Sequence, residues 1–121
     1  MARSYRELLV WQKAKALAVQ VYQTTECFPK IETYGLISQI RRAAVSVASN
    51  IAEGQGRLTS GEFLHYLGQA RDSLLELDTQ LAIALDLTYL DNFQYEGIAQ
   101  QLYQVLGLLN RLVESLRKKS A

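Results

Sequence analysis

The residues best able to do chemistry form a polar stripe within residues 34–57. Those inside the predicted helix recur every three or four positions and fall within an arc of roughly 80°, since each helical residue turns by about 100°. A second polar stripe follows in residues 60–86. The first consists of Gln39, Arg42, Ser46, Asn50, Glu53 and, just past the helix, Arg57, and the second of Glu62, His65, Gln69, Asp72 and Glu76.

These stripes allow three interpretations, because adjacent antiparallel helices can bring them together. They can form an ion-pair and amide network that sets the helix register or a subunit interface. They can line a groove for a ligand or partner. They can also form an acid–base active site at Asn50, Glu53 and Glu62. We favour the first interpretation, with a structural network of Gln39, Arg42, Asn50, Glu53 and Glu62.

Metal and nucleophile chemistry lack the residues that they require. A di-iron centre in a helical bundle needs two Glu-x-x-His pairs and two further glutamates, but the chain has one histidine and one such pair, Glu62 with His65. Cys27 has no histidine or asparagine near it in the sequence, and Gly54-Gln55-Gly56 is followed by no Gly-Lys-Ser/Thr. We therefore predict no metal site, no cofactor, no catalytic residue and no enzymatic activity.

Four segments with helical periodicity must position the polar stripes. Each carries an apolar seam of alternating three- and four-residue spacing, and period-two alternation typical of strands is absent. Short connections make neighbouring helices antiparallel, which predicts an all-α, up-down-up-down four-helix bundle. The seams are Val10, Ala14, Leu17, Val21, Thr24 and Phe28; Ile37, Ile40, Ala44, Val47 and Ile51; Phe63, Leu67, Ala70, Leu74, Leu77, Leu81 and Ala84; and Ile98, Leu102, Val105, Leu109, Leu112 and Leu116.

Local signals mark where these helices begin and end. Phe28-Pro29 closes the first, and Gly54 and Gly56 are expected to take left-handed conformations at the end of the second. Thr59 and Glu62 form a capping-box pattern for the third helix. Asp91 or Asn92 is expected to start the fourth.

Length and composition indicate one soluble domain over residues 1–121, with 49% hydrophobic residues and a net charge of +1. No global basic field marks a dedicated nucleic-acid binder. The single cysteine fits a reducing, cytoplasmic setting. Charges interrupt every apolar run, so we expect neither a signal peptide nor a membrane span.

Basic residues nevertheless gather near both ends of the chain. In an up-down bundle the fourth helix ends near the start of the first, so residues 3–15 and 111–119 would share one face. Such a face binds phosphate backbones through counterion release, without reading sequence. Besides Arg3 and Arg6, the candidate nucleic-acid-binding residues are Lys13, Lys15, Arg41, Arg42, Arg57, Arg111, Arg117, Lys118 and Lys119.

Apolar residues outside the seams exceed what a monomeric bundle needs. Some of them widen the core-facing stripe, and the remainder would form exposed patches that usually mark partner surfaces. This surplus predicts homo-oligomerisation. It consists of Leu9, Trp11, Ala18 and Tyr22 in the first helix and Tyr103, Leu106, Leu108 and Val113 in the fourth.

Several motifs together carry a family likeness. They are VWQKA at 10–14, FP at 28–29, YGL at 34–36, QIRRA at 39–43, NIAEG at 50–54 and EF at 62–63. The chain resembles the four-helix-bundle family whose founding members are encoded in intervening sequences of bacterial 23S ribosomal RNA genes. The similarity continues through residue 81 and covers most of the chain.

The resemblance implies a homopentamer, often with a central channel, and no enzymatic activity. A related branch, the accessory protein of diversity-generating retroelements, is associated with a reverse transcriptase and nucleic acid. RNA, DNA or a ribonucleoprotein, including a reverse transcriptase-like protein, is therefore the expected partner. The alternative is a protein-interaction scaffold without nucleic-acid affinity.

Overall fold

The computed structural model describes residues 4–120 and contains only helical elements and loops over that range. This confirms the all-α prediction. The four long helices are α1 (Leu9–Thr25), α2 (Leu36–Gln55), α3 (Ser60–Asp86) and α4 (Asn92–Ser120), and the short 3-10 turns are η1 (Tyr5–Glu7) and η2 (Lys30–Glu32).

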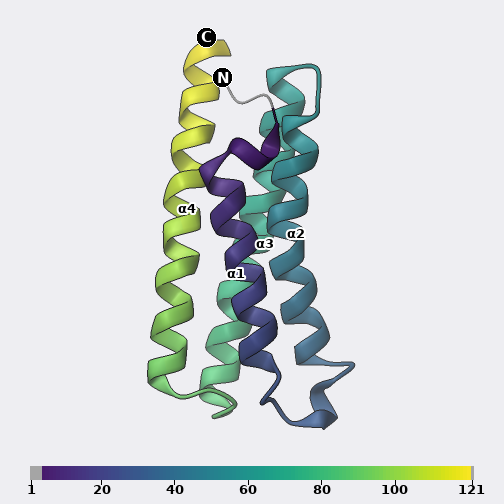
Figure 1. Cartoon of the computed structure of the whole chain (residues 1–121), viewed down its shortest axis with the longest axis vertical. Coiled ribbons are helices and arrows are strands. Elements are labelled where there is room, and N and C mark those ends of the chain that lie inside the picture. Colours follow the sequence, from purple (N-terminus) through teal and green to yellow (C-terminus); the bar gives the residue numbers. More distant parts are fainter. Residues whose placement is uncertain (1–3, 121) are drawn as a thin grey trace.

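The helices form an antiparallel up-down-up-down bundle (Figure 1). Helix α1 packs against α2 and α4, and α3 packs against the same two helices. Both ends of the described chain therefore lie at one end of the bundle, together with the α2–α3 loop. We call this the upper end, as drawn in Figure 1, and the opposite end, with residues 26–35 and 87–91, the lower end.

The predicted apolar seams form the core, with two adjustments. Most seam residues are buried, whereas Phe63, Leu112 and Leu116 are half-buried at its edge. The prediction for Thr24 was wrong: Thr25 takes the buried place, and its hydroxyl donates to the Val21 carbonyl at 2.8 Å. Since α1 ends at Thr25, Phe28 reaches the core from the loop rather than from the helix.

Side-chain caps start α3 and α4 where the sequence predicts. Thr59 Oγ1 accepts a hydrogen bond from the Glu62 amide at 3.1 Å. Asp91 and Gln94 form a reciprocal box, in which each side chain accepts a hydrogen bond from the other residue's amide, at 2.8 and 3.0 Å. These bonds satisfy amides that the first turn of a helix leaves without partners.

The glycines at the end of α2 act differently from the prediction. None of the described glycines has a positive φ, and Gly56 has right-handed values of −80° and −2°. Gly54 is buried within α2 and lets α3 approach closely. A Cβ on Gly54 would lie 2.8 Å from Phe63 Cδ1 and 2.9 Å from Tyr66 Cβ. The glycine is needed for close helix packing, so the prediction of left-handed caps was wrong.

We expect Gly54→Ala to lower the free energy of unfolding by about 1–3 kcal/mol, because the added methyl overpacks this contact. Gly68→Ala is the matched control, since Gly68 lies inside α3 with open space around its would-be Cβ. The control should gain about 0.5–1 kcal/mol through helix propensity. Urea unfolding followed by circular dichroism measures both, and equal changes would contradict the packing role of Gly54.

Glu32 links the two loops at the lower end. Its carboxylate accepts hydrogen bonds from the Leu36 amide at 3.0 Å, in the first turn of α2, and from the Tyr89 hydroxyl at 2.8 Å. Two donors lower the pKa of Glu32, first the Leu36 amide and second the Tyr89 hydroxyl. The Glu32 carboxylate in turn raises the pKa of Tyr89. The ring of Tyr89 lies 5.5 Å from that of Phe28, so the loops also share an aromatic contact.

Because the pKa of Glu32 is lower when folded, its ionised form stabilises the protein at neutral pH. That contribution should be lost as pH falls below the unfolded value of about 4.3 and through the lower folded pKa. We therefore expect wild-type stability to fall more steeply than that of Glu32→Gln in this acidic range. Thermal unfolding at a series of pH values checks this, and parallel curves would contradict it.

Candidate functional site

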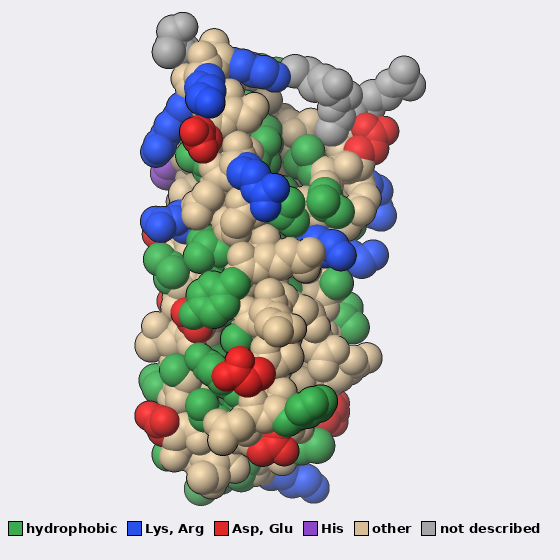
Figure 2. Space-filling view, turned by 90° about the vertical axis from the view of Figure 1, so that its left-hand side faces the viewer, with side chains coloured by type: hydrophobic (Ala, Val, Ile, Leu, Met, Phe, Trp, Pro, Cys, Tyr) green, Lys and Arg blue, Asp and Glu red, His purple; other side chains and the backbone are tan. Residues whose placement is uncertain are grey.

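Charge is divided along the bundle axis. Among described residues, nine of the twelve Lys and Arg lie in the upper half, against five of the twelve Asp and Glu. The lower half has three cations and seven anions. Figure 2 shows the basic side chains mainly toward the upper end and the acidic ones mainly below the middle. A nearly neutral chain thus has one end with an excess of four positive charges.

We call the cations nearest the upper end the basic end, and they come from both ends of the sequence and, with Arg57, from the α2–α3 loop. The last turns of α4 lie beside the start of α1 because the bundle is antiparallel. Cations also interact favourably with the carbonyl end of a helix such as α4. Arg3 lies outside the described residues. The basic end consists of Arg6, Lys13, Lys15, Arg57, Arg111, Arg117, Lys118 and Lys119.

Aromatic rings hold several of these cations in place. The guanidinium of Arg6 lies 5.5 and 5.6 Å from the ring centres of Tyr5 and Trp11, and Lys15 Nζ lies 5.4 Å from that of Trp11. The rings of Tyr5 and Trp11 meet edge to face at 5.0 Å. Sequence reasoning assigned Trp11 to an apolar surplus and missed this cluster, although the alternation of aromatic and basic residues was a usable signal.

Arg57 and Lys118 also have partners. Arg57 forms an ion pair with Glu53 at 3.7 Å, lies over the Tyr66 ring and donates to its hydroxyl. Lys118 pairs with Glu114 at 3.7 Å. Both side chains stay substantially exposed, and exposed pairs contribute little energy. These cations can therefore exchange their partners for a phosphate.

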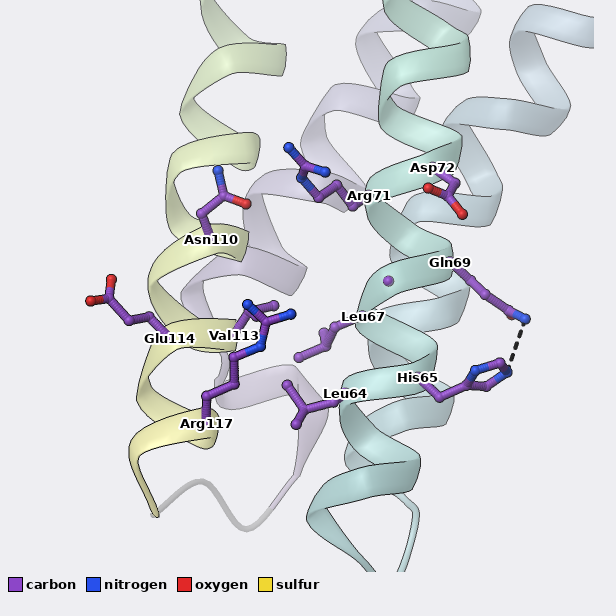
Figure 3. A pocket seen from close by; sticks show the side chains of 11 residues that line it. Leu64, His65, Leu67, Gln69, Arg71, Asp72, Asn110, Val113, Glu114 and Arg117 are labelled. Carbon is purple, nitrogen blue, oxygen red and sulfur yellow. Dashed lines mark hydrogen bonds between the residues drawn. The ribbon is translucent and has the colours of Figure 1, made fainter. Parts of the chain in front are cut away.

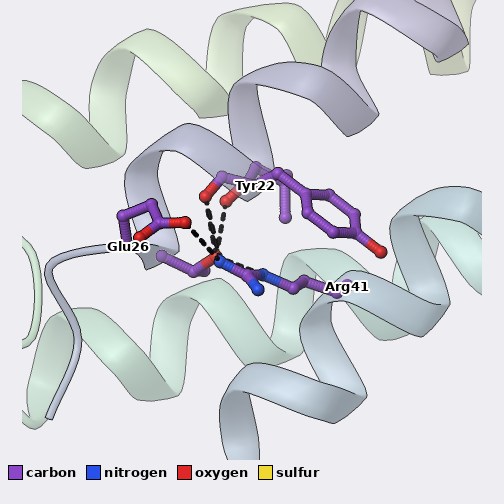
Figure 4. Close-up of polar contacts among 5 residues, drawn as sticks. Tyr22, Glu26 and Arg41 are labelled. Carbon is purple, nitrogen blue, oxygen red and sulfur yellow. Dashed lines mark hydrogen bonds and ion pairs between the residues drawn. The ribbon is translucent and has the colours of Figure 1, made fainter. Parts of the chain in front are cut away.

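Arg41 and Arg42 lie apart from the basic end, in the lower half of α2. Arg41 Nε donates to Thr25 Oγ1 at 2.9 Å, and its Nη2 donates to the Tyr22 carbonyl at 3.2 Å (Figure 4). It also lies 4.6 Å from the Tyr22 ring centre and 3.8 Å from the Glu26 carboxylate. Arg41 thus caps the carbonyl end of α1. Arg42 is exposed and makes a long 3.4 Å bond to Ser38 in its own helix.

The predicted polar network is spread along α2 and α3. Ser46 and Ser73 join the two helices at 2.9 Å, and Asn50 donates to the Ser46 carbonyl and hydroxyl at 2.9 and 3.0 Å. Glu53 pairs with Arg57, and Gln39 and Arg42 line a shallow groove with residues of α3. Glu62 contributes its amide to the α3 cap. The hydrogen bond that joins α2 to α3 in this network thus runs between two serines. The amide and charged side chains lie on either side of it.

A larger groove of about 890 Å³ separates α3 from α4 in the upper half. Leu64, Leu67 and Val113 lie between the helices, and Arg117 extends over them from α4 (Figure 3). Arg71 enters the same groove from α3, and neither guanidinium has an ion-pair or hydrogen-bond partner among the described residues. Sequence reasoning missed Arg71, which lies outside both polar stripes. Two arginines thus lie in the groove, whereas Asp72 and Glu114, which also line it, point away from its centre (Figure 3).

No group of three histidine, cysteine, aspartate or glutamate side chains within residues 4–120 is arranged to hold a metal ion. No helix in that range has the length and apolar character needed to cross a membrane.

The fold and the basic end define an antiparallel four-helix bundle with strongly divided charge. Residues 6–111 match the model of the 23S rRNA-intervening sequence protein family, and the chain belongs to this family. It is also similar to a crystal structure of a protein with unknown function from the S23 ribosomal protein family of Bacteroides thetaiotaomicron. The TM-score is 0.81 at 22% identity, over 87% of this chain and 98% of that one. No curated protein matches the chain.

We expect Arg41→Ala to lower the free energy of unfolding by about 1–3 kcal/mol, since it leaves Thr25 and the end of α1 without their donor. Arg42→Ala, the neighbouring control, should change it by less than about 0.5 kcal/mol because Arg42 is exposed. Urea unfolding of both variants tests this. Equal losses would show that Arg41 does not hold α1 to α2.

Proposed function

We propose that this protein is a non-enzymatic, homo-oligomeric, cytoplasmic bundle that binds RNA or DNA, alone or within a ribonucleoprotein. The observation that carries the proposal is the gathering of cations from α1 and α4 at one end. The name of the family refers to 23S rRNA, and this favours RNA as the first ligand to test. A reverse transcriptase-like protein remains the candidate protein partner.

Binding of this kind uses the phosphate backbone. The basic end presents mostly exposed lysine and arginine side chains, without a motif for reading base edges. Lys and Arg that replace condensed counterions give affinity without sequence specificity.

Homo-oligomerisation, for which the family resemblance implies a pentamer, would strengthen this binding. Copies arranged side by side would bring several basic ends onto one face, so that a weak monomer becomes a tight multivalent binder. The apolar surplus supports assembly, although five of its eight residues pack at the edge of the core. The exposed members are Leu9, Tyr22 and Tyr103.

We expect Lys118→Ala/Lys119→Ala to weaken binding to a 23S rRNA fragment and to flatten its salt dependence. Each lost phosphate contact should reduce the slope of log affinity against log salt by about 0.7–0.9. Lys30→Ala/Arg42→Ala in the lower half is the control, because it removes the same total charge away from the basic end. Filter binding at several salt concentrations measures both pairs.

Two results would contradict the proposal. Absence of wild-type binding at low salt would leave the interaction scaffold, the alternative that the exposed apolar residues favour. Equal losses in the two double variants would mean that net charge, rather than the basic end, governs binding.

A further inference from the structure

An apolar groove runs along the α1–α2 face, with a volume of about 540 Å³. Its centre is lined by the half-buried alanines Ala18, Ala48 and Ala52, and exposed Val19 and Val45 stand beside them. Val19 is 50% exposed and Val45 42%. Small residues between larger ones leave room for side chains of another helix. We call this surface the α1–α2 groove.

The outward face of α3 carries a row of large exposed side chains, in contrast to the small residues of the α1–α2 groove. Leu75, Thr79 and Ile83, with Leu87 directly after the helix, recur every four residues, and the three apolar members are 41%, 45% and 47% exposed. At a rise of about 1.5 Å per residue, this α3 ridge is about 18 Å long. It points away from the buried seam of the same helix, so its apolar side chains have no place in the monomer's own core.

One buried group beside the ridge lacks a partner. Gln80 is 7% exposed, and its Oε1 has no hydrogen-bond partner among the described residues. Gln80 borders the shallow groove that Arg42 and Glu76 also line. A buried acceptor without a donor costs about 1–3 kcal/mol. Because this oxygen is shielded from solvent within the monomer, the Gln80 side chain must turn outward to meet a donor on a second chain that covers this surface.

We propose that the α3 ridge of one copy packs into the α1–α2 groove of a second copy. Large side chains on the ridge complement the alanines of the groove. The charges also match: Lys15 is the charged residue lining the groove, and Asp72 and Glu76 lie next to the ridge. Tyr22 and Gln23 line the groove as well and offer hydroxyl and amide donors of the kind that Gln80 lacks.

This contact joins two different surfaces of the same chain. It is therefore heterologous and repeats from copy to copy, closing into a ring when the rotation between copies permits. It rests on the homo-oligomeric part of the proposed function and specifies its interface. Lys15 would then serve the subunit contact, while Lys118 and Lys119 remain free for phosphate.

Light scattering on size-exclusion chromatography tests the proposal with complementary variants of the full chain. Ile83→Arg should disable the ridge and Val19→Arg the groove, so each variant alone should have the mass of one chain. Mixed one to one, they still share one intact ridge and one intact groove, so they should form a dimer of two chains and nothing larger. Phe93→Arg is the control, since Phe93 is 88% exposed on α4 and should leave the wild-type assembly unchanged.

Gln80→Leu supplies an independent measurement, because it replaces the unpartnered amide without adding charge. It should weaken self-association about fivefold or more if the second copy provides a donor to Gln80. Unchanged association would overturn the role of Gln80. Circular dichroism of Ile83→Arg and Val19→Arg should match wild type, since both sites are solvent-exposed.

Oligomers of wild-type size in either arginine variant, or a mixture that stays monomeric, would overturn this interface while leaving the proposed function intact. A monomeric wild type at all concentrations would overturn both this interface and the homo-oligomeric part of the proposed function. Nucleic-acid binding is measured separately on the same preparations, so the two failures can be told apart.

Discussion

The close contact between α2 and α3 is the constraint on which the remaining structure depends. Gly54 lies against Phe63 and Tyr66 with no room for a Cβ, and Ser46 meets Ser73 two turns lower. Together these contacts fix both the separation and the register of the pair. Two turns further down, the same register brings Gln39 and Gln80 to one shallow groove. Polar residues thus repeat along this helix pair at the spacing of a coiled coil, beside a seam that is wholly apolar.

The antiparallel arrangement also explains the division of charge. Two helices begin and two end at each end of the bundle, so their macrodipoles largely cancel there. The positive character of the upper end therefore comes from side chains, and it depends on α4 ending beside the start of α1. The net charge of the chain gives no indication of this, because the lower half holds an equal excess of acidic residues among those described.

Long-range polar contacts close the two ends of the bundle in different ways. At the lower end, Arg41 joins α2 to the last turn of α1, and Glu32 joins two loops through Tyr89. At the upper end, exposed cations are held by aromatic rings and by ion pairs between residues four positions apart. The lower end is thus fastened by specific hydrogen bonds, whereas the upper end keeps exposed charges in weaker contacts.

The sequence by itself determined the helices, most of the seams, the starts of α3 and α4 and the chain positions of the basic residues. These follow from local rules, since helical periodicity and capping involve residues within a few positions of each other. Only the tertiary structure decided that Arg41 caps α1, that Gly54 serves helix packing, that Thr25 replaces Thr24 in the core and that Arg71 and Arg117 line one groove. Apart from the threonine, which depends on where α1 ends, each of these depends on the rotation and register of one helix against another. A periodic pattern leaves that rotation and register open, because many neighbouring settings bury the same apolar residues.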